Sequence, residues 1–78
     1  MNVTIYLKPT CPFCKKALMV LKRLNANITE IDIAADPSRR PEMIQKANQR
    51  TTVPQIFIDG EHIGGCDDLL ARQKAGQL

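Results

Sequence analysis

Apolar and polar residues alternate at the start of the chain, and the period then changes. Val3, Ile5 and Leu7 alternate with Asn, Thr and Tyr, which is the two-residue period of a β-strand. From Cys14 onward the apolar residues are spaced by three and four, as in a helix that packs one face against a core. They are Ala17, Leu18, Leu21 and Leu24. The pattern predicts a first strand here, followed by a helix over about residues 12–25.

The next two segments predict another strand and another helix. Residues 28–33 are rich in β-branched side chains and favour a second strand, which is parallel to the first because a helix separates the two. Residues 38–48 favour a second helix with its apolar residues on one side. They are Met43, Ile44 and Ala47. Pro37 and Pro41 both suit the first turn of a helix, so the start of this helix stays open.

Two short apolar runs near the end of the chain flank a tight-turn dipeptide. Ile56–Ile58 and Glu61–Ile63 are joined by Asp59-Gly60, which tolerates the positive φ angles of a two-residue hairpin turn. Gly64-Gly65 ends the hairpin, and the aspartates at 67 and 68 favour the N-terminus of a third helix. The predicted order is βαβαββα, an α/β fold in a single domain over residues 1–78.

Composition narrows the class of protein. The 78-residue chain is 44% hydrophobic and has no Trp, which allows one small core of aliphatic side chains. Three cysteines cannot all pair, which favours a reducing, cytoplasmic compartment over a disulfide-stapled secreted protein. No signal peptide or membrane-spanning segment is expected. The net charge of +3, with few aromatics, argues against nucleic acid and suits a small anionic ligand.

The segment Cys11-Pro12-Phe13-Cys14 places two thiols one helical turn apart where the first strand gives way to the helix. If Pro12 takes the first helical position, Cys11 becomes the N-cap, and the NH groups of Phe13 and Cys14 and the helix dipole favour negative charge on its sulfur. Cys14 begins the apolar face of the helix and is expected to be buried and protonated. Cys11 is therefore predicted to attack a disulfide and Cys14 to resolve the intermediate.

The other possible uses of the cysteines fit the sequence less well than a redox pair. A zinc site would need two more ligands, for which only Cys66 and His62 are available, and their spacing is unlike that of a zinc knuckle. An interpretation of Cys11 and Cys14 as two inert core thiols disagrees with the position of Cys11 at the start of the helix, off its apolar face. Cys66 is expected to be a small buried residue, with a third redox thiol as the alternative. His62 is expected to face outward from the hairpin, and it is given no role.

Several motifs together resemble a dithiol glutaredoxin over nearly the whole chain. They are Lys8, Thr10-Cys11-Pro12-Phe13-Cys14, Thr52-Val53-Pro54 and Gly64-Gly65-Cys66-Asp67-Asp68. The resemblance implies a thioredoxin fold, in which a four-stranded mixed sheet is flanked by three helices. It also implies a cis peptide bond before Pro54. Phe13 departs from the family pattern, because tyrosine is commoner at that position.

The resemblance implies a glutathione-dependent thiol-disulfide oxidoreductase that acts on protein disulfides and on glutathione mixed disulfides. Its catalytic residues would be Cys11 and Cys14, with glutathione as reductant and no metal. The glutathione site would comprise Lys8, Cys11, Phe13, Thr52, Val53, Pro54, Gly65, Cys66 and Asp67. Lys8 would neutralise the glycine carboxylate and Asp67 the ammonium group. Arg39, Arg40 and Arg50 remain open as further partners of the glycine carboxylate.

Two other functions in this family stay open at this point. One is an iron-sulfur carrier in which two Cys11 thiolates and two glutathiones hold a cluster in a dimer, although Pro12 and Cys14 disfavour it. The other is a redoxin reduced by thioredoxin reductase.

The expected state is a cytoplasmic monomer without nucleic-acid or membrane partners. The expected protein substrates of the oxidoreductase are disulfide-containing or glutathionylated proteins, with ribonucleotide reductase as one candidate.

Overall fold

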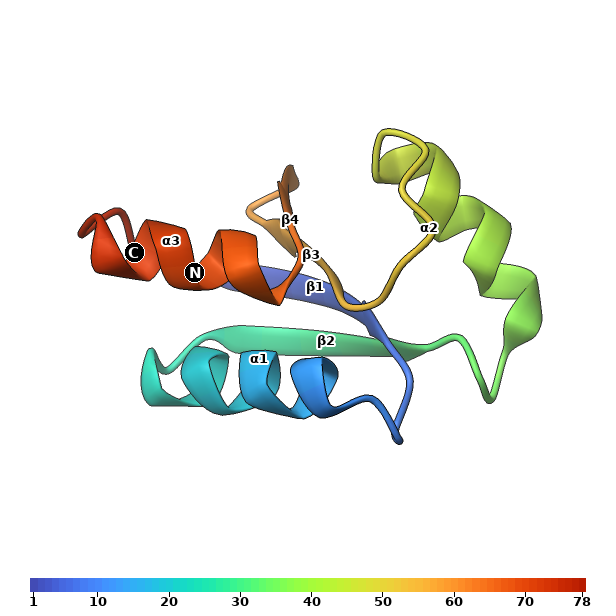
Figure 1. Ribbon diagram of the computed structural model, residues 1–78, viewed down its shortest axis with the longest axis horizontal. Coiled ribbons are helices and arrows are strands. Elements are labelled where there is room, and N and C mark those ends of the chain that lie inside the picture. Colours follow the sequence, from blue (N-terminus) through green and yellow to red (C-terminus); the bar gives the residue numbers. More distant parts are fainter.

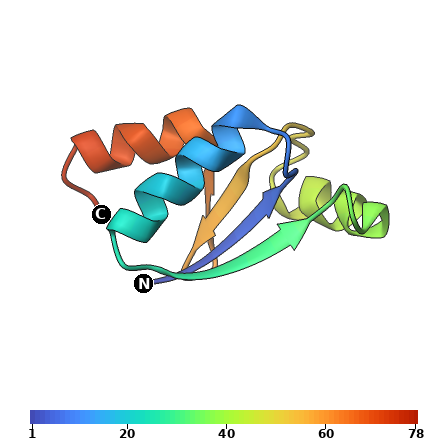
Figure 2. The same cartoon turned by 90° about the horizontal axis from the view of Figure 1, so that it is seen from below.

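The computed structural model describes residues 1–78 as one mixed sheet with helices on both of its faces. The strands lie in the order β2-β1-β3-β4. Figures 1 and 2 show α1 and α3 side by side over one face of the sheet, while α2 lies apart from them, near the end of β2. The elements are β1 (Asn2–Leu7), α1 (Pro12–Arg23), β2 (Asn27–Asp32), a 3₁₀ turn η1 (Pro37–Arg39), α2 (Arg40–Lys46), β3 (Gln55–Ile58), β4 (Glu61–Gly64) and α3 (Cys66–Lys74).

The central strand β1 pairs with a parallel and an antiparallel neighbour. Val3 lies opposite Ile28 in the parallel β2, and Ile5 lies opposite Ile56 in the antiparallel β3. β3 and β4 form the predicted hairpin. The βαβαββα order and the four-stranded mixed sheet with three α-helices are therefore confirmed. No helix in the structure combines the length and the apolar character needed to cross a membrane.

The sheet buries side chains on both faces. The larger cluster lies under α1 and α3 and contains the predicted apolar side of β1 together with Ala17, Leu21, Ile56 and Leu69. A smaller cluster on the opposite face joins Tyr6, Ile33 and Met43. Tyr6 stands at a polar position of the strand pattern but is only 2% exposed. Its hydroxyl donates to Glu42, which attaches α2 to the sheet.

Helix boundaries differ from the sequence pattern where the backbone turns left-handed. α1 ends at Arg23 rather than near Asn25, because Asn25 has φ 56° and the NH of Ala26 returns to the carbonyl of Leu21, a Schellman-type ending. Pro37 opens η1 and Pro41 is the second residue of α2, so each proline lies in the first turn of its own helical segment. α2 ends at Lys46, short of the predicted residue 48.

Candidate active site

Cys11 occupies the mouth of α1, as the sequence predicted. It is the N-cap residue with extended backbone (φ −84°, ψ 116°), and Pro12 holds the first helical position. The NH of Cys14 donates to the Cys11 sulfur at 3.3 Å. No such bond is made by the NH of Phe13, whose side chain is 59% exposed. The Cys11 sulfur is thus partly accessible and receives one backbone donor together with the positive end of the helix dipole.

Cys14 lies one turn deeper and in a different environment. It is 1% exposed and belongs to the main core cluster. Burial, followed by the hydrogen bond with Cys11, raises the pKa of the Cys14 thiol to about 12. Cys14 therefore keeps its proton at neutral pH while Cys11 is accessible. The predicted difference in burial between the two thiols is confirmed.

The segment after α2 approaches the mouth of α1 from the other side. The Cys11 thiol donates to the Val53 carbonyl, with 3.9 Å between sulfur and oxygen. The peptide bond between Val53 and Pro54 is cis, as the resemblance implied. Pro54 is buried, whereas Thr52 is exposed. This contact joins Cys11 to Val53, which lies 42 positions away in the sequence.

A groove of about 140 Å³ runs from Phe13 to the N-terminus of α3. The nine residues that line it are Phe13, Arg50, Thr52, Val53, Pro54, Gly65, Cys66, Asp67 and Asp68. Seven of them belong to the predicted glutathione site. Of the other two predicted residues, Cys11 does not line the groove itself but contacts Val53, which does. Lys8 lies outside the groove and lines a separate hollow with Glu30 and Asp32.

Arg50 and Asp68 line the groove although the predicted site did not include them. Their side chains form an ion pair with 3.2 Å between Nη1 and Oδ2, and the same Asp68 oxygen accepts the Gly65 NH at 2.9 Å. The Gly65 hydrogen bond, helped by Arg50, lowers the pKa of the Asp68 carboxyl. Gly64 has φ 121°, which other residues rarely adopt, and a Cβ there would also crowd the Asp68 carboxylate, so this position favours glycine. The spacing of Gly65 and Asp68, three residues apart as in a capping box, was the available sequence signal.

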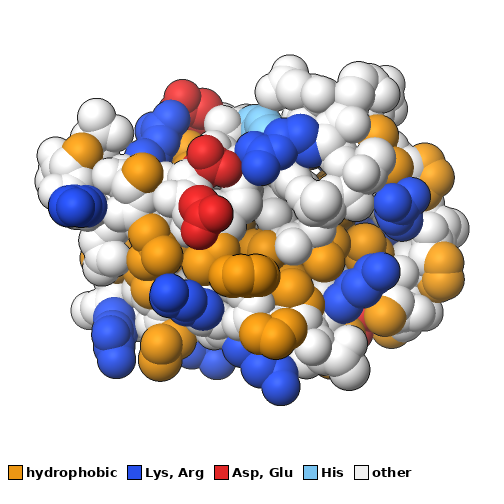
Figure 3. All heavy atoms as spheres, viewed as in Figure 1, with side chains coloured by type: hydrophobic (Ala, Val, Ile, Leu, Met, Phe, Trp, Pro, Cys, Tyr) orange, Lys and Arg blue, Asp and Glu red, His pale blue; other side chains and the backbone are white.

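The three arginines left open in the sequence have different surroundings. Arg39 pairs with Glu42 at 2.9 Å, and Arg40 donates to the Thr51 carbonyl at 3.3 Å. Arg50 alone among them lines the groove. Figure 3 shows acidic and basic side chains next to each other on this face, above a band of apolar side chains. The groove therefore offers both signs of charge beside an apolar surface.

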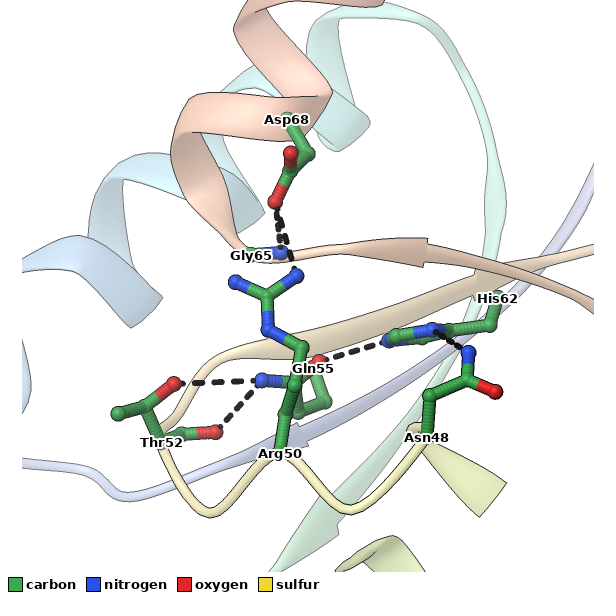
Figure 4. A network of polar contacts seen from close by, with 7 residues as sticks. All are labelled: Asn48, Arg50, Thr52, Gln55, His62, Gly65 and Asp68. Carbon is green, nitrogen blue, oxygen red and sulfur yellow. Dashed lines mark hydrogen bonds and ion pairs between the residues drawn. The ribbon is translucent and has the colours of Figure 1, made fainter.

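The expectation that His62 faces outward from the hairpin was wrong. Its side chain is partly buried, and its two ring nitrogens lie 2.8 Å from Gln55 Oε1 and 3.1 Å from Asn48 Nδ2 (Figure 4). Burial, followed by the charge of Arg50, lowers the pKa of the ring. Because both nitrogens are engaged, His62 does not join the cysteines in the zinc set considered from the sequence. No group of three or more His, Cys, Asp or Glu side chains is arranged to hold a metal ion.

Cys66 begins α3 at the edge of the groove, which it helps to line. It is 5% exposed, and burial raises the pKa of its thiol. Its side chain packs in the same core cluster as Cys14, as expected for a small buried residue. Its position makes the thiol less accessible than that of Cys11.

Comparisons with known proteins converge on one family. The family model described as Glutaredoxin matches residues 3–63. Glutaredoxin 3 of Escherichia coli K12 is 49% identical over 77 residues, covering 99% of this chain and 92% of its own length. The solution structure of a glutaredoxin from Brucella melitensis has a TM-score of 0.82 at 45% identity and covers 99% of this chain and 83% of its own. The buckwheat glutaredoxin–glutathione complex has a TM-score of 0.88 at 26% identity, covering 97% and 71%.

Proposed function

The chain belongs to the glutaredoxin family and is a thiol-disulfide oxidoreductase with a thioredoxin fold, and from this premise we propose that glutathione is its reductant. Its substrates in this proposal are glutathione mixed disulfides and protein disulfides. The observation that carries the proposal is the groove, which joins the accessible Cys11 to a surface with charges of both signs. The similarity to a glutaredoxin that was crystallised with glutathione supports it.

The reaction with a glutathionylated protein needs Cys11 alone. The Cys11 thiolate attacks the glutathione sulfur, a Cys11–glutathione disulfide forms, and the protein thiolate leaves and takes up a proton. A second glutathione thiolate then attacks the glutathione sulfur of that intermediate, which yields oxidised glutathione and restores the Cys11 thiolate. The NH of Cys14, which donates to the Cys11 sulfur, would hold that sulfur in place both when it attacks and when it leaves.

The reaction with a protein disulfide needs both cysteines. Cys11 attacks one sulfur of the disulfide and forms a mixed disulfide with the protein, and the other sulfur leaves. Cys14 then loses its proton, attacks the Cys11 sulfur and releases the reduced protein. Two glutathiones reduce the resulting Cys11–Cys14 disulfide. The buried, protonated Cys14 suits this second role, because it reacts only with a disulfide held next to it.

Glutathione would lie along the groove as an extended peptide with its sulfur at Cys11. A volume of about 140 Å³ holds only part of such a tripeptide, so its outer side would stay in solvent. The backbone of Val53 would pair with the cysteinyl residue of glutathione as an added strand. At the other end, the NH groups of Cys66 and Asp67 at the start of α3 would bind the γ-glutamyl carboxylate. The Asp67 side chain would bind the ammonium group.

The glycine carboxylate of glutathione would meet positive charge at its end of the groove. Lys8 lines the separate hollow that Cys14 also lines, so it would bind the glycine carboxylate from outside the groove. Arg50 lines the groove at the opposite end, where it pairs with Asp68 at the start of α3, so its guanidinium would lie beside the γ-glutamyl carboxylate instead. Phe13 and Thr52 would cover the sides of the ligand, and Pro54 and Gly65 would form its floor.

We also propose that residues 1–78 act as one glutaredoxin domain, because both core clusters pack on the same sheet. The odd number of cysteines favours a reducing cytoplasm. Disulfide-containing or glutathionylated proteins are the partners, with ribonucleotide reductase as one candidate. The working form is a monomer, since every proposed site residue comes from one chain.

The choice of reductant tests the proposal. Turnover of a glutathionylated peptide is measured with glutathione and glutathione reductase, and in parallel with thioredoxin reductase. The proposal expects turnover that depends on glutathione and saturates with the peptide. Faster turnover with thioredoxin reductase would overturn the glutathione assignment. A brown, dimeric protein with charge-transfer absorbance would instead favour the iron-sulfur carrier.

A further inference from the structure

The loop between α2 and β3 supplies much of the groove but has little regular structure of its own. Four of the nine lining residues come from it, namely Arg50, Thr52, Val53 and Pro54. Its first residues, Asn48 and Gln49, have positive φ angles of 54° and 69°. Among the backbone hydrogen bonds outside helices and strands, none involves residues 51–54. The shape of this loop must therefore be set by side chains.

Gln55, the first residue of β3, holds the end of the loop. It is the one buried polar residue of the protein, with 0% exposure. Its amide nitrogen donates to the Thr52 carbonyl at 2.9 Å and lies 3.3 Å from the Thr52 hydroxyl. Because the carbonyl can only accept, the Gln55 nitrogen must point at Thr52 and its oxygen at His62. His62 therefore carries a proton on Nε2 and donates it to Gln55 over 2.8 Å.

The other nitrogen of His62 holds the beginning of the loop. In the neutral ring Nδ1 is an acceptor, and the Asn48 side-chain nitrogen lies 3.1 Å from it. Burial and the nearby Arg50 lower the pKa of His62, which favours this neutral form, while Asp68 acts in the opposite direction. The ring also packs on Phe57, with 5.0 Å between ring centroids. Figure 4 shows that a single imidazole reaches Asn48 at one end of the loop and Gln55 at the other.

We propose that His62 is a positioning residue that fixes the loop of residues 48–55 for glutathione. His62 holds Asn48 directly and Thr52 through Gln55. It thereby sets where the Val53 backbone and Arg50 lie along the groove, without touching the ligand itself. This inference rests on the proposed use of glutathione. In this proposal His62 affects the affinity for the substrate, whereas the reactivity of Cys11 depends on α1.

Replacing the ring tests this role with a matched pair of variants. His62→Phe keeps a ring against Phe57 but removes both nitrogens, whereas His62→Gln keeps an NH near the position of Nε2. With His62→Phe, the KM for a glutathionylated peptide should rise about fivefold, from about two- to threefold for each of the two neutral hydrogen bonds that are lost, while kcat stays within about twofold. His62→Gln should restore most of the affinity. Glu61→Gln, at an exposed neighbour in the same strand, should leave both constants unchanged.

The outcomes separate this inference from the proposed function. A wild-type KM in His62→Phe, or an equal loss in His62→Gln and His62→Phe, would overturn the positioning role. If wild-type turnover does not need glutathione, the proposed function fails and the inference fails with it.

A second variant covers the case in which His62→Phe does not fold. Asn48→Gly keeps a residue suited to positive φ and removes only the amide that meets Nδ1. It should raise the KM by about twofold with kcat unchanged, since one of the two ends is released. An unchanged KM in this variant would contradict the role of His62 at the start of the loop.

Discussion

The start of α1 and the loop of residues 48–55 meet at Cys11, but they are built in different ways. Around Cys11 the important contacts come from within four consecutive residues, because Cys14 donates to the Cys11 sulfur and Pro12 sets the helix start. The loop instead depends on side chains from β4 and α3. His62 binds both of its ends, and Asp68 pairs with Arg50.

The difference separates reactivity from recognition. A local motif is enough to make one thiol accessible and the other buried, so changes there should act on the chemical step. The loop contributes its backbone and a charge at positions that distant residues fix, so changes there should act on affinity. The substitutions below test this division, from the largest expected effect to the smallest.

Replacing the attacking thiol should have the largest effect. Cys11→Ser should lower activity on every disulfide substrate by at least about 1000-fold, because a hydroxyl does not replace a thiolate in disulfide exchange. The measurement is turnover of a glutathionylated peptide and of a protein disulfide. Cys66→Ser is the control, because this thiol is only 5% exposed and the substitution keeps the backbone NH that the proposal uses, so activity should be kept. Retained activity without Cys11 would refute the mechanism.

Replacing the resolving thiol should divide the two reactions. Cys14→Ser should slow reduction of protein disulfides by about 100-fold or more, because an adjacent thiol competes far better than one in solution. Removal of glutathione from a mixed disulfide should continue, since that step uses Cys11 and a second glutathione. Parallel assays with both substrates measure the split. An equal loss in both assays would show that Cys14 has another role.

Replacing the groove arginine should affect affinity alone. Arg50→Ala should raise the KM for a glutathionylated peptide about tenfold with little change in kcat, the effect of losing a charge-assisted hydrogen bond. Its ion pair with Asp68 is 45% and 46% exposed, so stability should change little. Arg72→Ala, which breaks another α3 ion pair outside the groove, is the control. A lower kcat with unchanged KM would contradict the division between the regions.

Acid should affect the loop and leave Cys14 unchanged, because that thiol is already protonated at neutral pH. The pKa of His62 lies below its ordinary value of 6.5, so its stabilising contribution is complete above pH 6.5. As the pH falls through 6.5 and then through the folded pKa, the unfolded chain takes up the proton first and the free energy of unfolding decreases. Denaturant unfolding between pH 7.5 and about 5 measures this small decrease. Because His62 is the only histidine, His62→Gln should flatten the profile, and an unchanged profile would contradict its burial.

The region around α1 could be predicted from the sequence because its contacts are short in range. The position of Pro12 determines the helix start, and the spacing of the apolar residues places Cys14 on the buried face. Both features hold in the structure. The element order followed in the same way from periodicity and from the Asp59-Gly60 turn.

The loop could not be predicted because its contacts join residues far apart in the sequence. His62 looked like an exposed hairpin residue, since the sequence does not show that Asn48 and Gln55 converge on the same face of the sheet. Arg50 was one of three equivalent arginines until its pair with Asp68 placed it at the groove. The burial of Tyr6, at a polar position of the strand pattern, has a similar cause, because α2 covers the face on which it lies.

The position of glutathione is the central claim, and the mixed disulfide between glutathione and Cys11 tests it most directly. This species can be prepared in the Cys14→Ser protein, where no resolving thiol removes it. NMR contacts from glutathione to Val53 in the loop and to Cys66 and Asp67 at the start of α3 are expected. A mixed disulfide with mercaptoethanol, which lacks the peptide, should show none of them. Glutathione contacts confined to Phe13 and the rest of α1 would contradict the account.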